Sequence, residues 1–124
     1  MTSASDPTDP AELCIQVHPD AAPALDLAML REQFESIANT ESCVIRSRAE
    51  EGEDNGRYLN LAFKTSNRAH LWSIVEAKLY AHPTFGSLLR KSSMTICTGD
   101  SGWDDYLVLY HFNPEVEIDA IDEL

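Results

Sequence analysis

The chain has 124 residues, of which 44% are apolar and 24% charged, and its formal net charge is −12 at pH 7. This length and apolar content support one hydrophobic core but not two, so we expect a single folded domain. The negative charge opposes binding to the phosphate backbone of nucleic acids. No apolar run approaches the ~18 residues that cross a bilayer. We therefore expect neither a nucleic acid nor a membrane as partner.

The first residues lack the basic flank and the apolar stretch of a secretory signal, which predicts a cytoplasmic protein. The three cysteines, Cys14, Cys43 and Cys97, are far apart and odd in number. This pattern indicates small buried hydrophobes rather than disulfides or zinc ligands. The chain carries no recognisable cofactor-binding or metal-binding motif, so we expect neither a cofactor nor a metal.

Residues 1–11 are rich in Pro, Ser, Thr and Asp, and they predict a flexible arm before a single domain over residues 12–112. Apolar and polar residues alternate over residues 13–17, which is the period of a half-buried strand. Apolar residues then recur at three- and four-residue spacing, which predicts a first helix over residues 22–38.

A second strand is expected over residues 42–49, with Arg46 and Arg48 on its outer face. We expect Val44 on the same outer face, and Cys43 and Ile45 on the core face. The polar loop that follows ends in Asn55-Gly56, a strong signal for a hairpin turn. The second and third strands should therefore be antiparallel neighbours.

The third strand is expected over residues 57–64, with Leu59, Leu61 and Phe63 on its core face. A second helix should follow the capping residues 65–67 and end near Ala81. We expect a short third helix over residues 83–91, then a fourth strand over 94–98 and a fifth over 106–112.

The expected element order is β-α-β-β-α-β-β. Hairpins join neighbouring strands and parallel crossovers are right-handed, so the simplest arrangement is an α+β, ferredoxin-like split βαβ fold. It has a mainly antiparallel five-stranded sheet in the order 5-4-1-3-2, with the helices on one face. Residues 113–124 form an acidic C-terminal tail.

The segment Gly99 to Tyr106 is the most distinctive part of the sequence, because a connection between two strands seldom needs an indole. It is expected to be a hairpin loop. In one interpretation Trp103 folds back over the sheet and braces the loop. In the other, Trp103 and Tyr106 bind a basic partner, with Asp100, Asp104 and Asp105 around them. The aspartate spacing does not match a calcium-binding loop.

Four histidines lie too far apart in the sequence to form a metal-binding pattern. If a small molecule binds this protein, His18 and His111 are the best candidates to line its pocket, together with Asn60 on the third strand, because strand positions on a sheet face can border a cavity. No motif indicates a nucleophile with an activating base, so the sequence favours a non-catalytic protein.

Residues Ser42 to Leu89 follow a strand-turn-strand-helix pattern that ends in His82-Pro83-Thr84-Phe85-Gly86-Ser87-Leu88-Leu89. This stretch resembles the dimeric α+β barrel proteins of the antibiotic-biosynthesis-monooxygenase type. The resemblance implies a homodimer in which two sheets close into one barrel, with a pocket between each sheet and its helices. It assigns no catalytic residue.

Two functions are left open. From Asp100 to the end there are eight carboxylates and no Lys or Arg, which suits a non-catalytic inhibitor or immunity-type protein that binds a basic partner. The alternative is a dimeric α+β barrel that binds or transforms a small apolar molecule.

Overall fold

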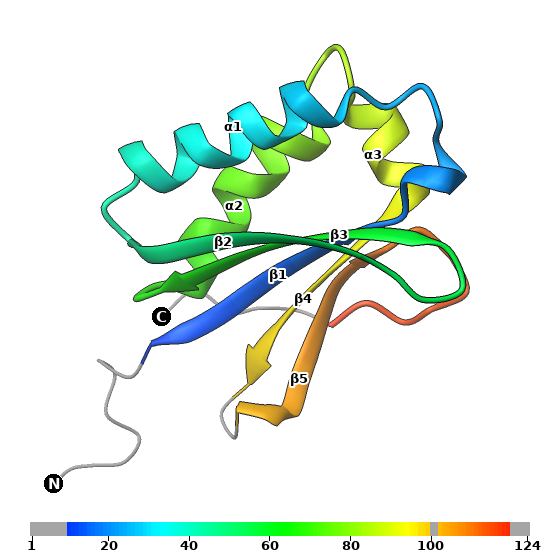
Figure 1. Cartoon of the computed structure of the whole chain (residues 1–124). Coiled ribbons are helices and arrows are strands. Elements are labelled where there is room, and N and C mark those ends of the chain that lie inside the picture. The colour runs from blue at the N-terminus through cyan, green and yellow to red at the C-terminus, as the bar shows by residue number, and fades with distance from the viewer. Residues whose placement is uncertain (1–9, 100–101, 120–124) are drawn as a thin grey trace, which may run out of the picture.

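A computed structural model describes residues 10–99 and 102–119 of the chain. The described residues form a five-stranded antiparallel sheet with the order β2-β3-β1-β4-β5, which reads 5-4-1-3-2 from the other edge. The helices cover one face of this sheet (Figure 1). The α+β class and the five-stranded antiparallel sheet expected from the sequence are therefore confirmed.

The strands are β1 (Ala11–Val17), β2 (Val44–Glu53), β3 (Arg57–Thr65), β4 (Ser93–Gly99) and β5 (Gly102–His111). The α-helices are α1 (Leu27–Thr40), α2 (Arg68–Val75) and α3 (Gly86–Ser92). A 3-10 turn (η1, Pro19–Ala21) follows β1, and a π-helical turn (η2, Glu76–Tyr80) continues α2.

The core lies between the sheet and the helices. Leu13, Ile15 and Val17 of β1 are fully buried, as their alternation with polar residues predicts. On the neighbouring strand the same holds for Leu59, Leu61 and Phe63. The apolar stripe of α1 packs on these strands, and the rings of Phe34 and Phe63 lie 4.7 Å apart between centroids.

Helix α1 begins at Leu27, five residues later than the sequence pattern predicts. The Asp26 carboxylate accepts a hydrogen bond of 3.1 Å from the Met29 amide, so this residue is the N-cap. The preceding residues form a turn that the Leu25 amide closes by donating to the Ala22 carbonyl. The start predicted at residue 22 is wrong, because Asp26 caps the helix and the residues before it form this turn.

The hairpin between β2 and β3 turns at Asn55 and Gly56, whose φ angles are +58° and +125°. Asparagine and glycine are the residues that best adopt this left-handed region. The predicted turn is confirmed. Strand β2 runs on to Glu53, beyond its expected end at residue 49, and this extension is paired with β3.

A β-bulge lies at the start of β2. Val44 is opposite Thr65 and Arg46 is opposite Lys64, so Ile45 has no partner on β3. The extra residue reverses the alternation of faces. Val44 packs against the core, whereas Ile45 is 55% exposed. The predicted faces of these two residues are wrong.

Strand β5 begins at Gly102, four residues earlier than predicted. Trp103, Asp104 and Asp105 therefore belong to a strand and not to a hairpin loop, which corrects the sequence prediction. Asp residues are unfavourable in strands, and this hid the start of β5 from the pattern. Figure 1 shows that this first part of β5 bends sharply.

The described part of the acidic tail runs back along β5. The Asp119 amide donates a 2.8 Å hydrogen bond to the Val108 carbonyl, and the Val108 amide donates to Asp119 Oδ2 at 2.8 Å. Asp119 thus forms hydrogen bonds with both the backbone amide and the backbone carbonyl of Val108, on the free edge of β5.

Candidate functional site

The face of the sheet away from the helices is called the open face here. Residues that are Cα partners on neighbouring strands share a face, so the register assigns its members. They are Glu12, Cys14 and Gln16 on β1; Arg46, Arg48 and Glu50 on β2; Tyr58, Asn60, Ala62 and Lys64 on β3; Met94, Ile96 and Thr98 on β4; and Val108 and His111 on β5.

Residues 103–106 form a wide irregularity in β5. Leu107 is paired with Cys97 and Gly102 with Gly99, so four residues of β5 stand opposite the single residue Thr98. We call residues 103–106 the β5 bulge. All four are exposed, and Trp103 and Tyr106 keep 42% and 54% of their surface accessible. A bulge of this kind re-aims side chains away from the regular sheet.

Glycine makes the β5 bulge possible. A Cβ atom at Gly99 would collide with the backbone carbonyl oxygen of Asp105. Gly102, at the start of the strand, has a φ of +75° and open space around it. Only a residue without a side chain lets β4 approach the bulged strand this closely.

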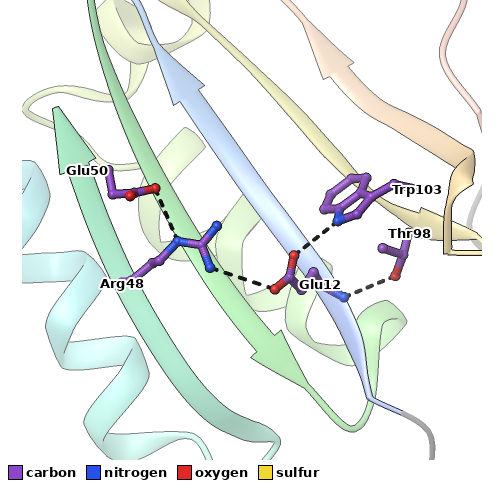
Figure 2. Close-up of polar contacts among 5 residues, drawn as sticks. All are labelled: Glu12, Arg48, Glu50, Thr98 and Trp103. Carbon is purple, nitrogen blue, oxygen red and sulfur yellow. Dashed lines mark hydrogen bonds and ion pairs between the residues drawn. The ribbon is translucent and has the colours of Figure 1, made fainter. Parts of the chain in front are cut away.

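The indole of Trp103 lies over the open face. Its Nε1 donates a hydrogen bond of 3.1 Å to Glu12 Oε1 on β1, across β4 (Figure 2). Glu12 Oε2 lies 3.9 Å from Arg48 Nη1, and Arg48 Nε donates to Glu50 Oε1 at 3.2 Å. The Glu12 amide donates to Thr98 Oγ1 at 3.0 Å. One carboxylate therefore connects the β5 bulge with β2 at the opposite edge of the sheet.

Asp104 and Asp105 have no such contacts. Among the described residues, no cationic side chain forms an ion pair with either carboxylate. In the sequence, Trp103 directly precedes these two aspartates and Tyr106 directly follows them. The structure thus brings together four of the five residues that the sequence predicts for a binding surface. The fifth, Asp100, lies outside the described residues.

The residues proposed for a small-molecule pocket are not all brought together. His18 and His111 meet at the ring of Phe112, with centroid distances of 6.0 and 4.6 Å. Asn60 lies in the middle of β3, opposite Gln16. Three strand spacings of about 4.8 Å separate β3 from β5, which places Asn60 far from His111. The Asn60 Oδ1 atom is buried and has no hydrogen-bond partner within the part of the chain that the structure describes.

The cysteines have no pairing among themselves. Cys43 and Cys97 are buried, as predicted, while Cys14 is half-buried on the open face. Burial raises the pKa of the Cys14 thiol to about 11, although the Arg48 guanidinium opposes the shift. Burial also raises the pKa of Cys97 to about 11. Both thiols stay protonated at neutral pH and are poor nucleophiles.

Sequence reasoning missed a basic hollow over β2 and β3, with a volume of about 360 Å³. Its charged lining consists of Arg46, Arg48 and Lys64 with Glu12. The alternation of Arg46 and Arg48 was visible in the sequence. Lys64 stands beside them because the register of the β2-β3 hairpin makes it the cross-strand partner of Arg46.

Within residues 10–99 and 102–119, no three His, Cys, Asp or Glu side chains group as metal ligands would. None of the helices in the same ranges has the length and apolar content to cross a membrane. The chain matches no protein-family model, no curated protein and no solved structure. The functional argument therefore depends on the surfaces described above.

Proposed function

We propose that this protein is a non-catalytic interaction module, of the inhibitor or immunity type, that binds a basic protein partner through the β5 bulge. The observation that carries the proposal is the exposure of four consecutive residues there, two aromatic and two acidic. Trp and Tyr are enriched at the water-excluding centres of protein interfaces, and polar or charged residues are typical of the rim around them.

Electrostatics supports a basic partner. The net charge of −12 attracts cations over a long range, and the carboxylates of Asp104 and Asp105, which form no ion pair with a described residue, concentrate this attraction at the bulge. Long-range attraction accelerates association, and contact with Trp103 and Tyr106 then slows dissociation. The hydrogen bond from Trp103 to Glu12 holds the indole in place before the partner arrives, which lowers the entropic cost of binding.

We also propose that the sheet is of the ferredoxin-like split βαβ type, with β5 added at one edge. The position of β1 between β3 and β4 and the antiparallel pairings support this assignment. The free cysteines support a reducing, cytoplasmic location, because disulfides are rare there.

The test is affinity capture from a native host extract with the wild-type protein and a variant carrying Asp104→Asn, Asp105→Asn and Tyr106→Ala. The control carries Glu32→Gln and Glu35→Gln, which remove two charges from the exposed face of α1. The wild type and the control should both capture a basic protein, and the triple variant should not. Capture should be weaker in high salt. Equal capture by the wild type and the triple variant would exclude the β5 bulge as the binding surface.

A second candidate is a dimeric α+β barrel that binds or transforms a small apolar molecule, in which two open faces pack together. It is favoured by one row of successive cross-strand partners on the open face, in which four of the five residues are apolar. The row consists of Arg48, Ala62, Cys14, Ile96 and Val108.

Analytical ultracentrifugation tests the second candidate. A barrel requires a dimer at micromolar concentration that Ile96→Lys disrupts, whereas Ile45→Lys, an exposed position near the end of the β2 edge, leaves it intact. A wild-type protein that sediments as a monomer at these concentrations would exclude the barrel.

A further inference from the structure

Three cationic side chains surround the basic hollow on the open face. Arg46 and Arg48 come from β2, and Lys64 comes from β3. The hollow has a volume of about 360 Å³, and Ala62, only 5% exposed, is part of its lining. The hollow lies toward the β2 edge of the sheet, whereas the β5 bulge lies at the opposite edge.

The arrangement of these cations is unfavourable in the absence of a ligand. Arg46 and Lys64 are direct cross-strand partners, and like charges in this position repel each other. The β-bulge next to this pair leaves Ile45 55% exposed. Two adjacent features at this end of β2, the pairing of like charges and the exposed Ile45, thus oppose stability.

The protein's own carboxylates neutralise only part of this charge. Arg48 is held by Glu50 at 3.2 Å and by Glu12 at 3.9 Å. Glu12 is opposite Lys64 in the register, but its oxygens are engaged by Trp103 and Arg48. Among the described residues, neither Arg46 nor Lys64 forms an ion pair. This is unusual in a chain with 21 acidic residues and 9 basic ones.

We propose that the hollow is a binding site for a phosphoryl group carried by a small molecule. Arg46 would offer the planar fork of donors that matches phosphate oxygens, and Lys64 would add a point charge from the neighbouring strand. A bound dianion would remove the repulsion between these two side chains. Arg48 would then turn from Glu12 toward the ligand, because a phosphoryl group carries more charge than a shared carboxylate.

The movement of Arg48 away from Glu12 would couple the hollow to the β5 bulge. Glu12 is the acceptor for Trp103 Nε1 and also a partner of Arg48. When Arg48 turns away, less of the negative charge on the Glu12 carboxylate is neutralised, which strengthens the hydrogen bond that Glu12 accepts from the Trp103 indole. Phosphoryl binding should therefore be detectable at Trp103, although that residue does not line the hollow.

The experiment is an NMR titration of ¹⁵N-labelled protein with inorganic phosphate and with pyrophosphate, at constant ionic strength set with chloride. We expect saturable shifts at Arg46, Arg48 and Lys64, a downfield shift of the Trp103 indole proton, and a dissociation constant for pyrophosphate of about 1 mM or lower. Shifts that do not saturate, or that scatter over all basic residues, would overturn the proposal.

Matched variants separate a site from general charge attraction. Arg46→Gln with Lys64→Gln should weaken pyrophosphate binding at least about tenfold. The control, Arg57→Gln with Lys91→Gln, removes two exposed cations elsewhere and should leave binding within about twofold. Equal weakening by both pairs would overturn the proposal.

A thermal measurement accompanies the titration. Without ligand, the Arg46→Gln, Lys64→Gln variant should unfold at the same temperature as the wild type or higher, because the repulsion is gone. Pyrophosphate should raise the melting temperature of the wild type and of the control but not of this variant. A rise of equal size in all three proteins would contradict the site.

Discussion

The indole Nε1 of Trp103 donates a hydrogen bond of 3.1 Å to Glu12 Oε1, although 91 positions separate the two residues in the sequence. The contact crosses β4 and connects an edge strand with the central strand of the sheet. It makes Trp103 part of the fold while 42% of its surface remains exposed. Bracing and binding, the two interpretations of this residue, are therefore compatible in one side chain.

The bracing contribution can be measured by substitution. Trp103→Phe should lower the free energy of unfolding by about 1 kcal/mol, because the ring stays but the hydrogen bond is lost. Trp103→Ala should lower it by about 2 to 3 kcal/mol, because the packing of the half-buried ring is lost as well. Urea denaturation checks both values. If Trp103→Ala unfolds at the same urea concentration as the wild type, Trp103 does not brace the sheet.

The hydroxyl of Tyr80 lies in the core, where Ser93 Oγ and Thr95 Oγ1 are each 2.8 Å away. Tyr80→Phe should lower the free energy of unfolding by about 1 to 3 kcal/mol, because two buried hydroxyls lose a partner. Ser73→Ala, at an exposed position of α2, is a control that should cost less than about 1 kcal/mol. Calorimetry compares the two variants, and equal effects would contradict the role of the buried hydroxyl network.

The same tyrosine predicts that the protein loses folding stability at alkaline pH. Burial raises the pKa of Tyr80 to about 12, while hydrogen bonds to Ser93 and Thr95 oppose the shift. The folded pKa lies above the unfolded value of about 10, so the protonated form stabilises the fold. This stabilisation is complete below pH ~10 and is lost as the pH rises toward 12. Denaturation midpoints at successive pH values should fall in this range for the wild type and fall less for Tyr80→Phe.

Gly99 is predicted to be intolerant of a side chain. Gly99→Ala places a methyl group against the Asp105 carbonyl, and backbone cannot move aside as a flexible side chain can. We expect a loss of about 1 to 3 kcal/mol in the free energy of unfolding. Gly102→Asn is the matched control, because this position is open and asparagine tolerates its positive φ. A control as unstable as Gly99→Ala would show that the steric account is wrong.

Asp119 should protect the edge of β5 from exchange with solvent. Its carboxylate accepts from the Val108 amide, and its own amide donates to the Val108 carbonyl. In Asp119→Ala the Val108 amide should exchange its hydrogen faster, by about tenfold or more, while the Leu109 amide changes little. Hydrogen exchange followed by NMR measures both rates. An unchanged rate at Val108 would show that the tail does not cover this edge.

The regular parts of the fold were predictable from local signals. Alternation in β1 and the Asn55-Gly56 turn each determine a local structure, and the structure agrees with both. Two bulges escaped prediction. The one at Ile45 depends on pairing with β3, and the one at residues 103–106 depends on the close approach of Gly99 to Asp105. Such features arise from contacts between strands, which a single-sequence pattern does not contain.

The same limit applies to the candidate sites. Trp103 and its neighbours stood out because their residue types are unusual for a connection between strands. The contact of Trp103 with Glu12 had no local signal, since it joins residues 91 positions apart. The basic hollow was missed for the same reason, because Lys64 comes from a second strand and meets Arg46 only through the pairing of β2 with β3.

Carboxyl and aromatic footprinting of the captured complex tests the central proposal most directly. Labelling of Asp104, Asp105 and Tyr106 should fall sharply when the partner is bound, whereas labelling of Glu32 and Glu35 on α1 should not change. Undiminished labelling of residues 104–106, with protection on the helices or on the basic hollow instead, would contradict the assignment of the β5 bulge as the interaction surface.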